Sequence, residues 1–229
     1  MPPAKPDRVR VACPKCGHSQ LEPGDAYSSI CKKCHQHFRL DELLHPTAQP
    51  GKPQIEQRKV RCFQCGTDLS VPVAAGSSMC KRCGSHVDLN DYRVTQTVSK
   101  NFRTHGRLIV EEKGYVLNSD AQVGEAVVKG RFIGKLVAVR TLEIYSSANI
   151  KGSFTAGQLV IPAGHHFRWP EPLRVEGADI GGELVAGLQA PGTVRLRSTA
   201  RFFGAIQARD LVVESGAVFV GSARVGAAR

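Results

Sequence analysis

The sequence contains no run of about 20 apolar residues, which is the length that a membrane-spanning helix needs. Residues 1–8 include three prolines and lack the apolar core of a signal peptide. We therefore expect a cytoplasmic protein with no transmembrane segment. Because the cytoplasm keeps thiols reduced, its eight cysteines are expected to bind metal rather than to form disulfides.

Signatures of catalysis are also missing. The sequence has no glycine-rich phosphate loop that opens a helix, no nucleophile motif and no carboxylate pair in a recognisable context. Glu111 and Glu112 precede Lys113, and the simplest interpretation of this charge cluster is a solvent-exposed turn. We therefore expect neither an enzyme nor a nucleotide-binding protein, and a polysaccharide-processing β-helix is the less favoured alternative.

The cysteines form two copies of one pattern. Two Cys-x-x-Cys pairs separated by fourteen residues occur twice, and the second set lies 49 residues after the first: Cys13, Cys16, Cys31 and Cys34, then Cys62, Cys65, Cys80 and Cys83. Four thiolates at this spacing suit the tetrahedral coordination of a structural Zn²⁺ ion. Gly17 and Gly66, directly after the second cysteine of each set, allow the tight turn that such a site needs.

Each cysteine unit spans about 30 residues, too few to fold by apolar burial alone, so bound metal is expected to supply much of its folding free energy. We predict two zinc ribbons with one structural Zn²⁺ each. A redox role for a single Cys-x-x-Cys pair is less favoured, because every such pair has a second pair at the spacing of a zinc ribbon. His37 and His86 follow the last cysteine of each set, but four sulfur atoms already complete a tetrahedron.

The C-terminal half is a repeat array. Residues 130–173 align without a gap on residues 182–225, an offset of 52, with twelve identities that include Gly130 with Gly182 and Gly152 with Gly204. Short apolar-x-apolar triplets such as 108–110, 142–144 and 211–213 recur, often 17 residues apart. Triplets of this kind indicate strands with one buried face, and the glycines indicate corners.

Three coils of about 17 residues would fill one 52-residue repeat, so we predict a parallel β-helix of roughly six to seven coils over residues 106–226. A β-sandwich with glycine-rich turns is less favoured, because its strands occupy different environments and do not repeat in sequence. A hexapeptide-type acyltransferase helix would need an aliphatic residue every six positions, and the sequence lacks that period.

The triplets, the apolar-x-glycine corners, and the segments 127–135 and 210–221 resemble the bactofilin family of bacterial cytoskeletal proteins. The resemblance covers about 120 of the 229 residues. It implies a right-handed, three-sided β-helix whose ends stack into filaments that need no nucleotide and have no polarity. Such filaments would serve as a scaffold. The long cysteine-rich N-terminal segment departs from the family pattern.

The predicted organisation is mainly β, with two small zinc ribbons before a right-handed parallel β-helix. The first ribbon covers residues 8–44, a proline-rich linker residues 45–59, the second ribbon residues 60–92, a second linker residues 93–105, and the β-helix residues 106–226.

The net charge gives only weak guidance about partners. Four thiolates around Zn²⁺ carry two negative charges, so two occupied sites lower the formal charge from +11 to about +7. An anionic partner is compatible with this charge, whether an acidic protein, a membrane surface or nucleic acid. Aromatic residues for base stacking are scarce in the ribbons, so nucleic acid is not favoured.

The ends of the predicted solenoid suggest its function. A terminal coil leaves unpaired backbone groups and an apolar cross-section, which a second copy can cover. At the C-terminal end we expect Val218, Phe219 and Val220 to form this polymer interface, although Phe219 is equally compatible with ordinary core packing. The favoured function is therefore a self-assembling scaffold with partner-recruiting ribbons. The alternative is a zinc-ribbon adaptor for nucleic acid or protein on an oligomerising β-helix.

Overall fold

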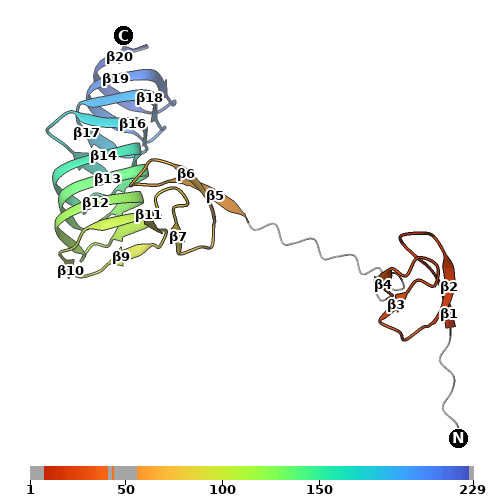
Figure 1. Ribbon diagram of the computed structural model, residues 1–229. Helices are drawn as coiled ribbons and strands as arrows, with labels where there is room; N and C mark the ends of the chain where they lie inside the picture. Colours follow the sequence, from red (N-terminus) through yellow and green to blue (C-terminus); the bar gives the residue numbers. More distant parts are fainter. Residues whose placement is uncertain (1–7, 41–42, 44–55, 227–229) are drawn as a thin grey trace, which may run out of the picture. The chain divides into compact units, whose positions relative to one another are not determined.

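The computed structural model describes residues 8–40, 43 and 56–226. The chain divides into two compact units, Met1–Ile55 and Glu56–Arg229. The first contains one four-cysteine module, which we call the first ribbon (residues 8–40). The second contains the other module, the second ribbon (residues 57–89), together with a long solenoid (Figure 1). Most of the predicted linker 45–59 lies outside the described residues.

Each ribbon consists of two antiparallel hairpins. The first ribbon has β1 (Arg8–Ala12) paired with β2 (Ser19–Pro23), and β3 (Ser28–Ile30) paired with β4 (His37–Arg39). The second has β5 (Gln57–Arg61) paired with β6 (Asp68–Pro72), and β7 (Ser77–Met79) paired with β8 (His86–Asp88). Strand β5 thus includes residues 57–59, which the sequence analysis assigned to the linker.

The solenoid contains the remaining twelve strands, joined in one sheet by parallel pairing. They are β9 (Tyr92–Val94), β10 (Thr97–Val98), β11 (Phe102–Val110), β12 (Tyr115–Val128), β13 (Arg131–Ile144), β14 (Asn149–Ile161), β15 (His166–Arg168), β16 (Leu173–Ile180), β17 (Glu183–Val185), β18 (Leu188–Leu196), β19 (Arg201–Val213) and β20 (Val218–Val225). The predicted parallel β-helix is therefore confirmed.

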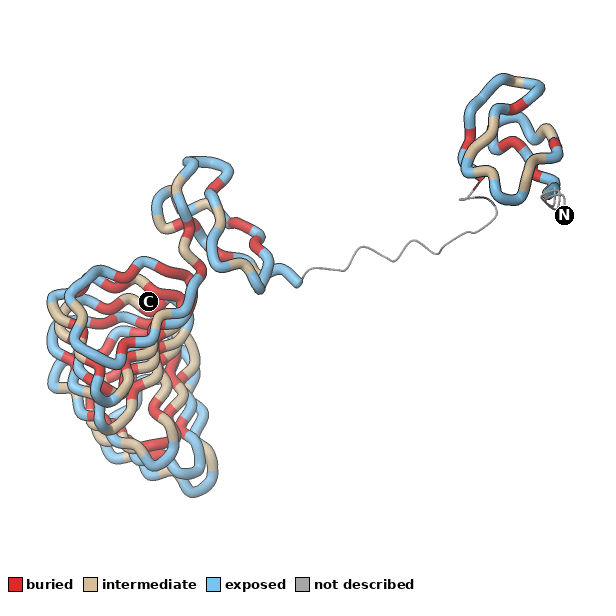
Figure 2. Tube along the Cα trace, turned by 90° about the horizontal axis from the view of Figure 1, so that it is seen from below, coloured by how far each residue is buried: buried red, intermediate tan, exposed pale blue. Residues whose placement is uncertain are grey.

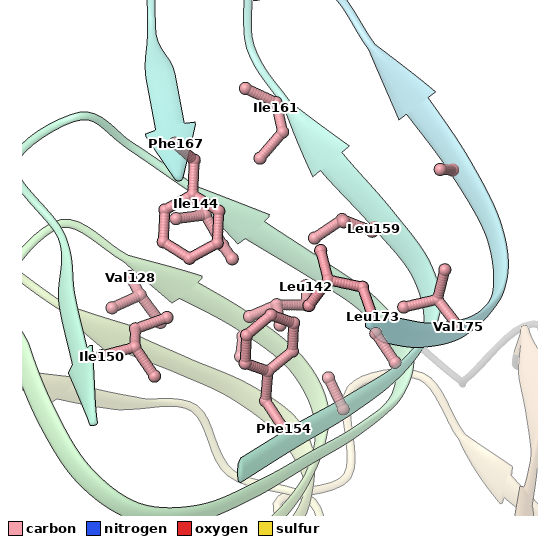
Figure 3. Close-up of a cluster of buried hydrophobic side chains, with 14 of the residues drawn as sticks. Val128, Leu142, Ile144, Ile150, Phe154, Leu159, Ile161, Phe167, Leu173 and Val175 are labelled. Atoms are coloured by element: carbon pink, nitrogen blue, oxygen red, sulfur yellow. The ribbon is translucent and has the colours of Figure 1, made fainter. Parts of the chain in front are cut away.

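Three walls make up each coil, as segments 108–110, 115–116 and 121–123 show for the second coil. Alternate residues point inward and stack on their counterparts in neighbouring coils. Figure 3 shows Leu142, Leu159 and Phe154 in this interior, and Leu142 and Leu159 have no exposed surface. The 52-residue offset corresponds to three coils, as the repeat predicted.

The solenoid has about eight coils, more than the predicted six to seven, because its first coil lies in the segment that the sequence analysis treated as the linker 93–105. There β9 pairs with β11, and β10 pairs with β12. Val94 and Phe102 of this coil are buried. Its strands β9 and β10 have only three and two residues, so a single apolar-x-apolar triplet, Tyr92–Val94, marks this coil in the sequence.

Stacked glycines form one corner of the solenoid. Gly134 pairs with Gly152, and Gly204 with Gly221, all with φ between 116° and 147°. A Cβ atom at Gly152 would lie 2.1 Å from the carbonyl oxygen of Gly134 in the preceding coil. Only glycine combines this backbone conformation with such a close approach. The corner glycines of the repeat are therefore steric requirements of the stack.

The second ribbon packs against the side of the first coils (Figures 1 and 2). The Phe63 ring stacks on the His105 ring, with centroids 3.9 Å apart and 8° between the planes. Arg103 Nη2 donates a 3.0 Å hydrogen bond to the Phe63 carbonyl oxygen, and Thr104 Oγ1 donates to the Asn90 carbonyl oxygen. The ribbon and the solenoid are thus joined by side-chain contacts as well as by the chain.

Replacing Gly152 should destabilise the solenoid far more than replacing Gly164. Gly152→Ala places a methyl group against the Gly134 carbonyl, and we expect a loss of about 3 kcal/mol or more. Gly164 also has positive φ but open space around its Cβ position, so Gly164→Ala should cost about 1 kcal/mol. Thermal unfolding followed by circular dichroism measures both. Equal losses would contradict the steric role of the corner.

His105 should make the folded protein, in which the second ribbon packs on the solenoid, less stable in acid. Burial, followed by the nearby charges of Arg140 and Arg58, lowers the pKa of His105 to about 4. An unfolded chain has the ordinary histidine pKa of about 6.5, so it binds one more proton than the folded protein between those values. The contribution of His105 to stability is therefore complete above about pH 6.5 and is lost as the pH falls towards 4.

The variant His105→Phe keeps a ring for Phe63 to stack on but cannot titrate. We expect the urea midpoint to fall less in the variant than in the wild type when the pH is lowered from 7 to 5. Parallel decreases in the two proteins would show that His105 is not responsible.

Candidate metal centres and the open solenoid end

All eight predicted ligands gather into two four-cysteine groups. Within each group, the Sγ atoms lie within 4.8 Å of one another: Cys13, Cys16, Cys31 and Cys34 in the first ribbon, and Cys62, Cys65, Cys80 and Cys83 in the second. One group therefore forms in each ribbon, between its two hairpins. His37 and His86 belong to neither group.

Tight turns present the sulfur atoms. In the first ribbon, Gly17 N donates to the Cys13 carbonyl oxygen at 2.9 Å, with Gly17 at φ 68°. The same turn occurs after the other three Cys-x-x-Cys pairs, where the left-handed residue is His35, Gly66 or Gly84. The glycines predicted to form these turns do so, and in one turn histidine adopts the conformation that glycine provides elsewhere.

The spacing of the sulfur atoms fits a tetrahedral metal ion. Cys13 and Cys34 are 3.7 Å apart through Sγ, and Cys16 and Cys31 are 3.6 Å apart. The corresponding distances in the second ribbon are 3.8 and 3.6 Å. Zn–S bonds of about 2.3 Å place the sulfur atoms of a tetrahedron about 3.8 Å apart, whereas a disulfide requires about 2.05 Å. Both groups are thus positioned to bind a metal ion.

Neighbouring polar groups lower the thiol pKa of Cys62 and Cys65 in the second ribbon, whereas the pKa of Cys80 is raised. The Ser85 hydroxyl lies 3.4 Å from Cys62 Sγ and 2.9 Å from Cys83 Sγ. Hydrogen bonding with Ser85, together with backbone N–H groups of Cys65 and Gln64, lowers the pKa of the Cys62 thiol to about 6. Because a metal ion binds the thiolate, these contacts prepare the site for coordination.

A different network links the hairpins of the first ribbon. Gln20 Nε2 donates to Glu22, to Ser29 Oγ and to the Ile30 carbonyl oxygen, while Gln20 Oε1 accepts from Lys32 N. The Ser29 hydroxyl also donates to Glu22 and lowers the pKa of that carboxyl group. Leu69 stands at the equivalent place in the second ribbon, within its apolar core. The two frameworks therefore use different contacts to hold the same cysteine geometry.

Within the part of the chain that the structure describes, nothing covers the C-terminal coil. Val213 and Val225 occupy inward positions but are 48% and 54% exposed, whereas their register partners Leu196 and Ala208 in the preceding coil are 0% and 2% exposed. The strand β20 pairs with β19 and with no other strand among the described residues. One apolar cross-section and one backbone edge are therefore open at this end.

The predicted interface residues occupy this coil but differ in orientation. Phe219 pairs in register with inward Phe202, is half-buried and lies 5.8 Å from that ring, centroid to centroid. Val218 and Val220 are 42% and 54% exposed on the outer side of the same strand. Val213 and Val225 were not predicted as end residues. A signal was present for Val213, because it is the last residue of the triplet 211–213 and the equivalent residues of other triplets are buried.

The N-terminal end is better covered. Val94 and Phe102 are 4% and 2% exposed, and Lys100 Nζ lies 4.7 Å from the centroid of the Tyr92 ring and 4.8 Å from that of Phe102. The strands at this end are short: β9 has three residues and β10 has two. The two ends of the solenoid therefore differ in chemistry.

Four arginines near the C-terminal end of the solenoid do not line up as a basic ladder. Arg195 lies in β18, Arg197 forms an ion pair with Asp179, Arg201 begins β19 on a different wall, and Arg209 forms an ion pair with Asp210. Pairing with carboxylates neutralises two of the four charges. This distribution does not provide a continuous basic track for a phosphate backbone.

No helix within residues 8–40, 43 and 56–226 is long and apolar enough to cross a membrane. Searches of curated proteins and of solved structures gave no match. The model of the Bactofilin family, described as polymer-forming cytoskeletal, matches residues 78–168. The matched segment runs from β7 of the second ribbon to β15, and the three-walled stacking continues beyond it to β20. The family model therefore supports the resemblance to bactofilins over residues 78–168, in a chain that carries two four-cysteine modules and a parallel β-helix.

Proposed function

We propose that this protein is a cytoplasmic scaffold whose β-helices join end to end into filaments without a nucleotide, and that it has no catalytic activity. The open C-terminal coil is the observation that carries the proposal. Its inward residues Val213 and Val225 are exposed, whereas the residues at the same positions of the preceding coil are buried. A second copy can cover this apolar surface and pair with the free edge of β20.

Burying one large apolar side chain contributes about 1.5–3 kcal/mol to the free energy of association. A few end residues on each copy therefore suffice for association without a nucleotide. The two ends would contribute unequally. At the N-terminal end, Lys100 lies over the aromatic rings of the first coil and the strand edges are short. We infer that C-terminal ends join more tightly, and that contacts between N-terminal ends complete the filament.

We propose that each ribbon binds a structural Zn²⁺ ion through its four cysteines and that the ribbons recruit or regulate partners of the filament. The sulfur spacing in both ribbons and the contacts that favour the Cys62 thiolate support zinc. The ion would hold the two hairpins of each ribbon together. The alternative function, an adaptor for nucleic acid or protein on an oligomerising β-helix, lacks support from a continuous basic surface.

Phe219→Arg should block assembly. The substitution places a charge in the proposed end contact, where burial without a partner is costly, so short oligomers should replace filaments in negative-stain images. Phe203→Arg is the matched control, because Phe203 follows inward Phe202 and lies on the outer side of the wall. Filaments of unchanged length in Phe219→Arg would refute the end contact. Discrete wild-type particles with steeply salt-dependent DNA binding would favour the adaptor.

Removing metal should unfold the ribbons and spare the solenoid. Metal analysis of protein purified under reducing conditions should find two zinc ions per chain. After chelation, proteolysis should cut residues 8–40 and 57–89 rapidly, while the strand signal of the solenoid persists. The solenoid is an internal control, because all eight cysteines lie in the ribbons. Protein that contains no zinc, or ribbons that resist protease after chelation, would contradict the assignment.

A further inference from the structure

The two ribbons are copies of one module, yet they differ in the turn through which the second ribbon meets the solenoid. The offset of 49 residues that relates the cysteines also relates Phe63 of the second ribbon to Pro14 of the first. Phe63 lies between Cys62 and Cys65, in the turn that carries two of the four sulfur atoms. The residue that contacts the solenoid is therefore part of the candidate metal site's own turn.

Two residues of β11 hold Phe63 from the solenoid side. His105 stacks its ring on that of Phe63, with centroids 3.9 Å apart and 8° between the planes. Arg103 Nη2 donates a 3.0 Å hydrogen bond to the Phe63 carbonyl oxygen, and the guanidinium carbon lies 5.8 Å from the ring centroid. Ring stacking depends on the position and the tilt of both rings. A shift of the cysteine turn would therefore break these contacts.

The other hairpin of the second ribbon, β7–β8, continues directly into the solenoid. Asp88 accepts hydrogen bonds from Asn90 N at 2.9 Å and from the Tyr92 hydroxyl. The Asn90 carbonyl oxygen accepts a 2.8 Å hydrogen bond from Thr104 Oγ1. A Cβ atom at Gly76 would lie 2.6 Å from Asn90 Oδ1, so a side chain there would displace the Asn90 amide. This hairpin is thus anchored to the first coil independently of Phe63.

The cysteines connect the two hairpins of the second ribbon. Cys62 and Cys65 lie in the turn of β5–β6, and Cys80 and Cys83 lie in the turn of β7–β8. The Sγ atoms approach each other across the hairpins, at 3.8 Å for Cys62 and Cys83 and at 3.6 Å for Cys65 and Cys80. The apolar cluster between the hairpins has only seven buried residues. Coordination by the four cysteines would therefore fix the Phe63 turn relative to the anchored hairpin.

We propose that metal binding by the second ribbon is coupled to the first coil of the solenoid through Phe63. When the four cysteines are coordinated, their turns hold Phe63 on His105. When they are not, the Phe63 turn moves, the stack opens and the wall formed by residues 102–104 is loosened, while the later coils keep their structure. The first ribbon has Pro14 at this position and belongs to a separate compact unit, so its site has no such effect. The inference rests on the proposed metal sites.

The coupling acts in both directions. If metal binding strengthens the contact between Phe63 and His105, the contact must strengthen metal binding by the same factor. His105 lies 42 residues after Phe63, in the solenoid, which contains no cysteine. A substitution at His105 should therefore change the metal affinity of the second ribbon, an effect that a ribbon folding by itself would not show.

The first test removes each site in turn from the full-length protein. The double variant Cys62→Ser, Cys65→Ser removes the second site, and Cys13→Ser, Cys16→Ser is the matched control at the equivalent positions of the first ribbon. Each should contain one zinc ion per chain in place of two. Amide hydrogen exchange of residues 102–105 should be about tenfold faster or more in the first variant, and within about twofold of the wild type in the control. The strands β13 and β14 should exchange at the wild-type rate in both.

The second test changes the solenoid side of the contact. His105→Ala removes the ring on which Phe63 stacks, whereas His105→Phe keeps a ring there. Titration of each protein with a competing zinc chelator measures the affinity of its two sites. One of the two sites should lose about fivefold or more in affinity in His105→Ala, and neither should change by more than about twofold in His105→Phe. Circular dichroism should show the same strand signal in both variants, because the later coils are unaffected.

Equal exchange rates of residues 102–105 in the two double variants, each with one zinc ion, would overturn the coupling and leave the metal sites standing. Equal zinc affinities of His105→Ala and the wild type would overturn the coupling as well. Wild-type protein that contains no zinc would instead overturn the metal sites themselves, and the coupling with them. Metal analysis therefore distinguishes failure of the inference from failure of the proposal on which it rests.

Discussion

Backbone pairing between successive coils is the constraint on which this structure depends. Each coil satisfies its backbone groups and buries its inward side chains through the coils on either side, so its stability depends on its neighbours. The last coil has a neighbour on one side alone. Val213 and Val225 are exposed for that reason, although the residues at the same positions of the preceding coil are buried. An end that a second copy could cover is therefore a consequence of how the fold is built.

The ribbons meet a different constraint. Their apolar clusters are small, with five buried residues in the first ribbon and seven in the second, and two residues of each cluster are cysteines. Such cores are too small to fold the ribbons by apolar burial alone, so a metal ion held by the four cysteines would supply much of the folding free energy. The second ribbon gains further support from Phe63, which stacks on His105. The second ribbon is thus packed on the solenoid through side chains that the first ribbon lacks at the equivalent positions.

The sequence predicted the features that recur and missed those made by single contacts. Corner glycines and paired cysteines have fixed spacing because local geometry requires them, so the parallel β-helix and both four-cysteine groups could be predicted. The first coil was missed because its strands β9 and β10 are only three and two residues long and offer a single triplet. The contact between Phe63 and His105 joins residues 42 positions apart and has no periodic signal. Comparing the ribbons position by position would have drawn attention to Phe63, Gly76 and Asp88.

The proposed assembly and recruitment would reinforce each other. A single ribbon offers only a small surface, which would bind one segment of a partner weakly. A filament would repeat that surface once per subunit. A partner with two or more such segments would then bind its second segment at a high effective concentration, which raises the overall affinity without new contacts. The open end of the solenoid would therefore control recruitment, because it sets how many first ribbons are displayed together.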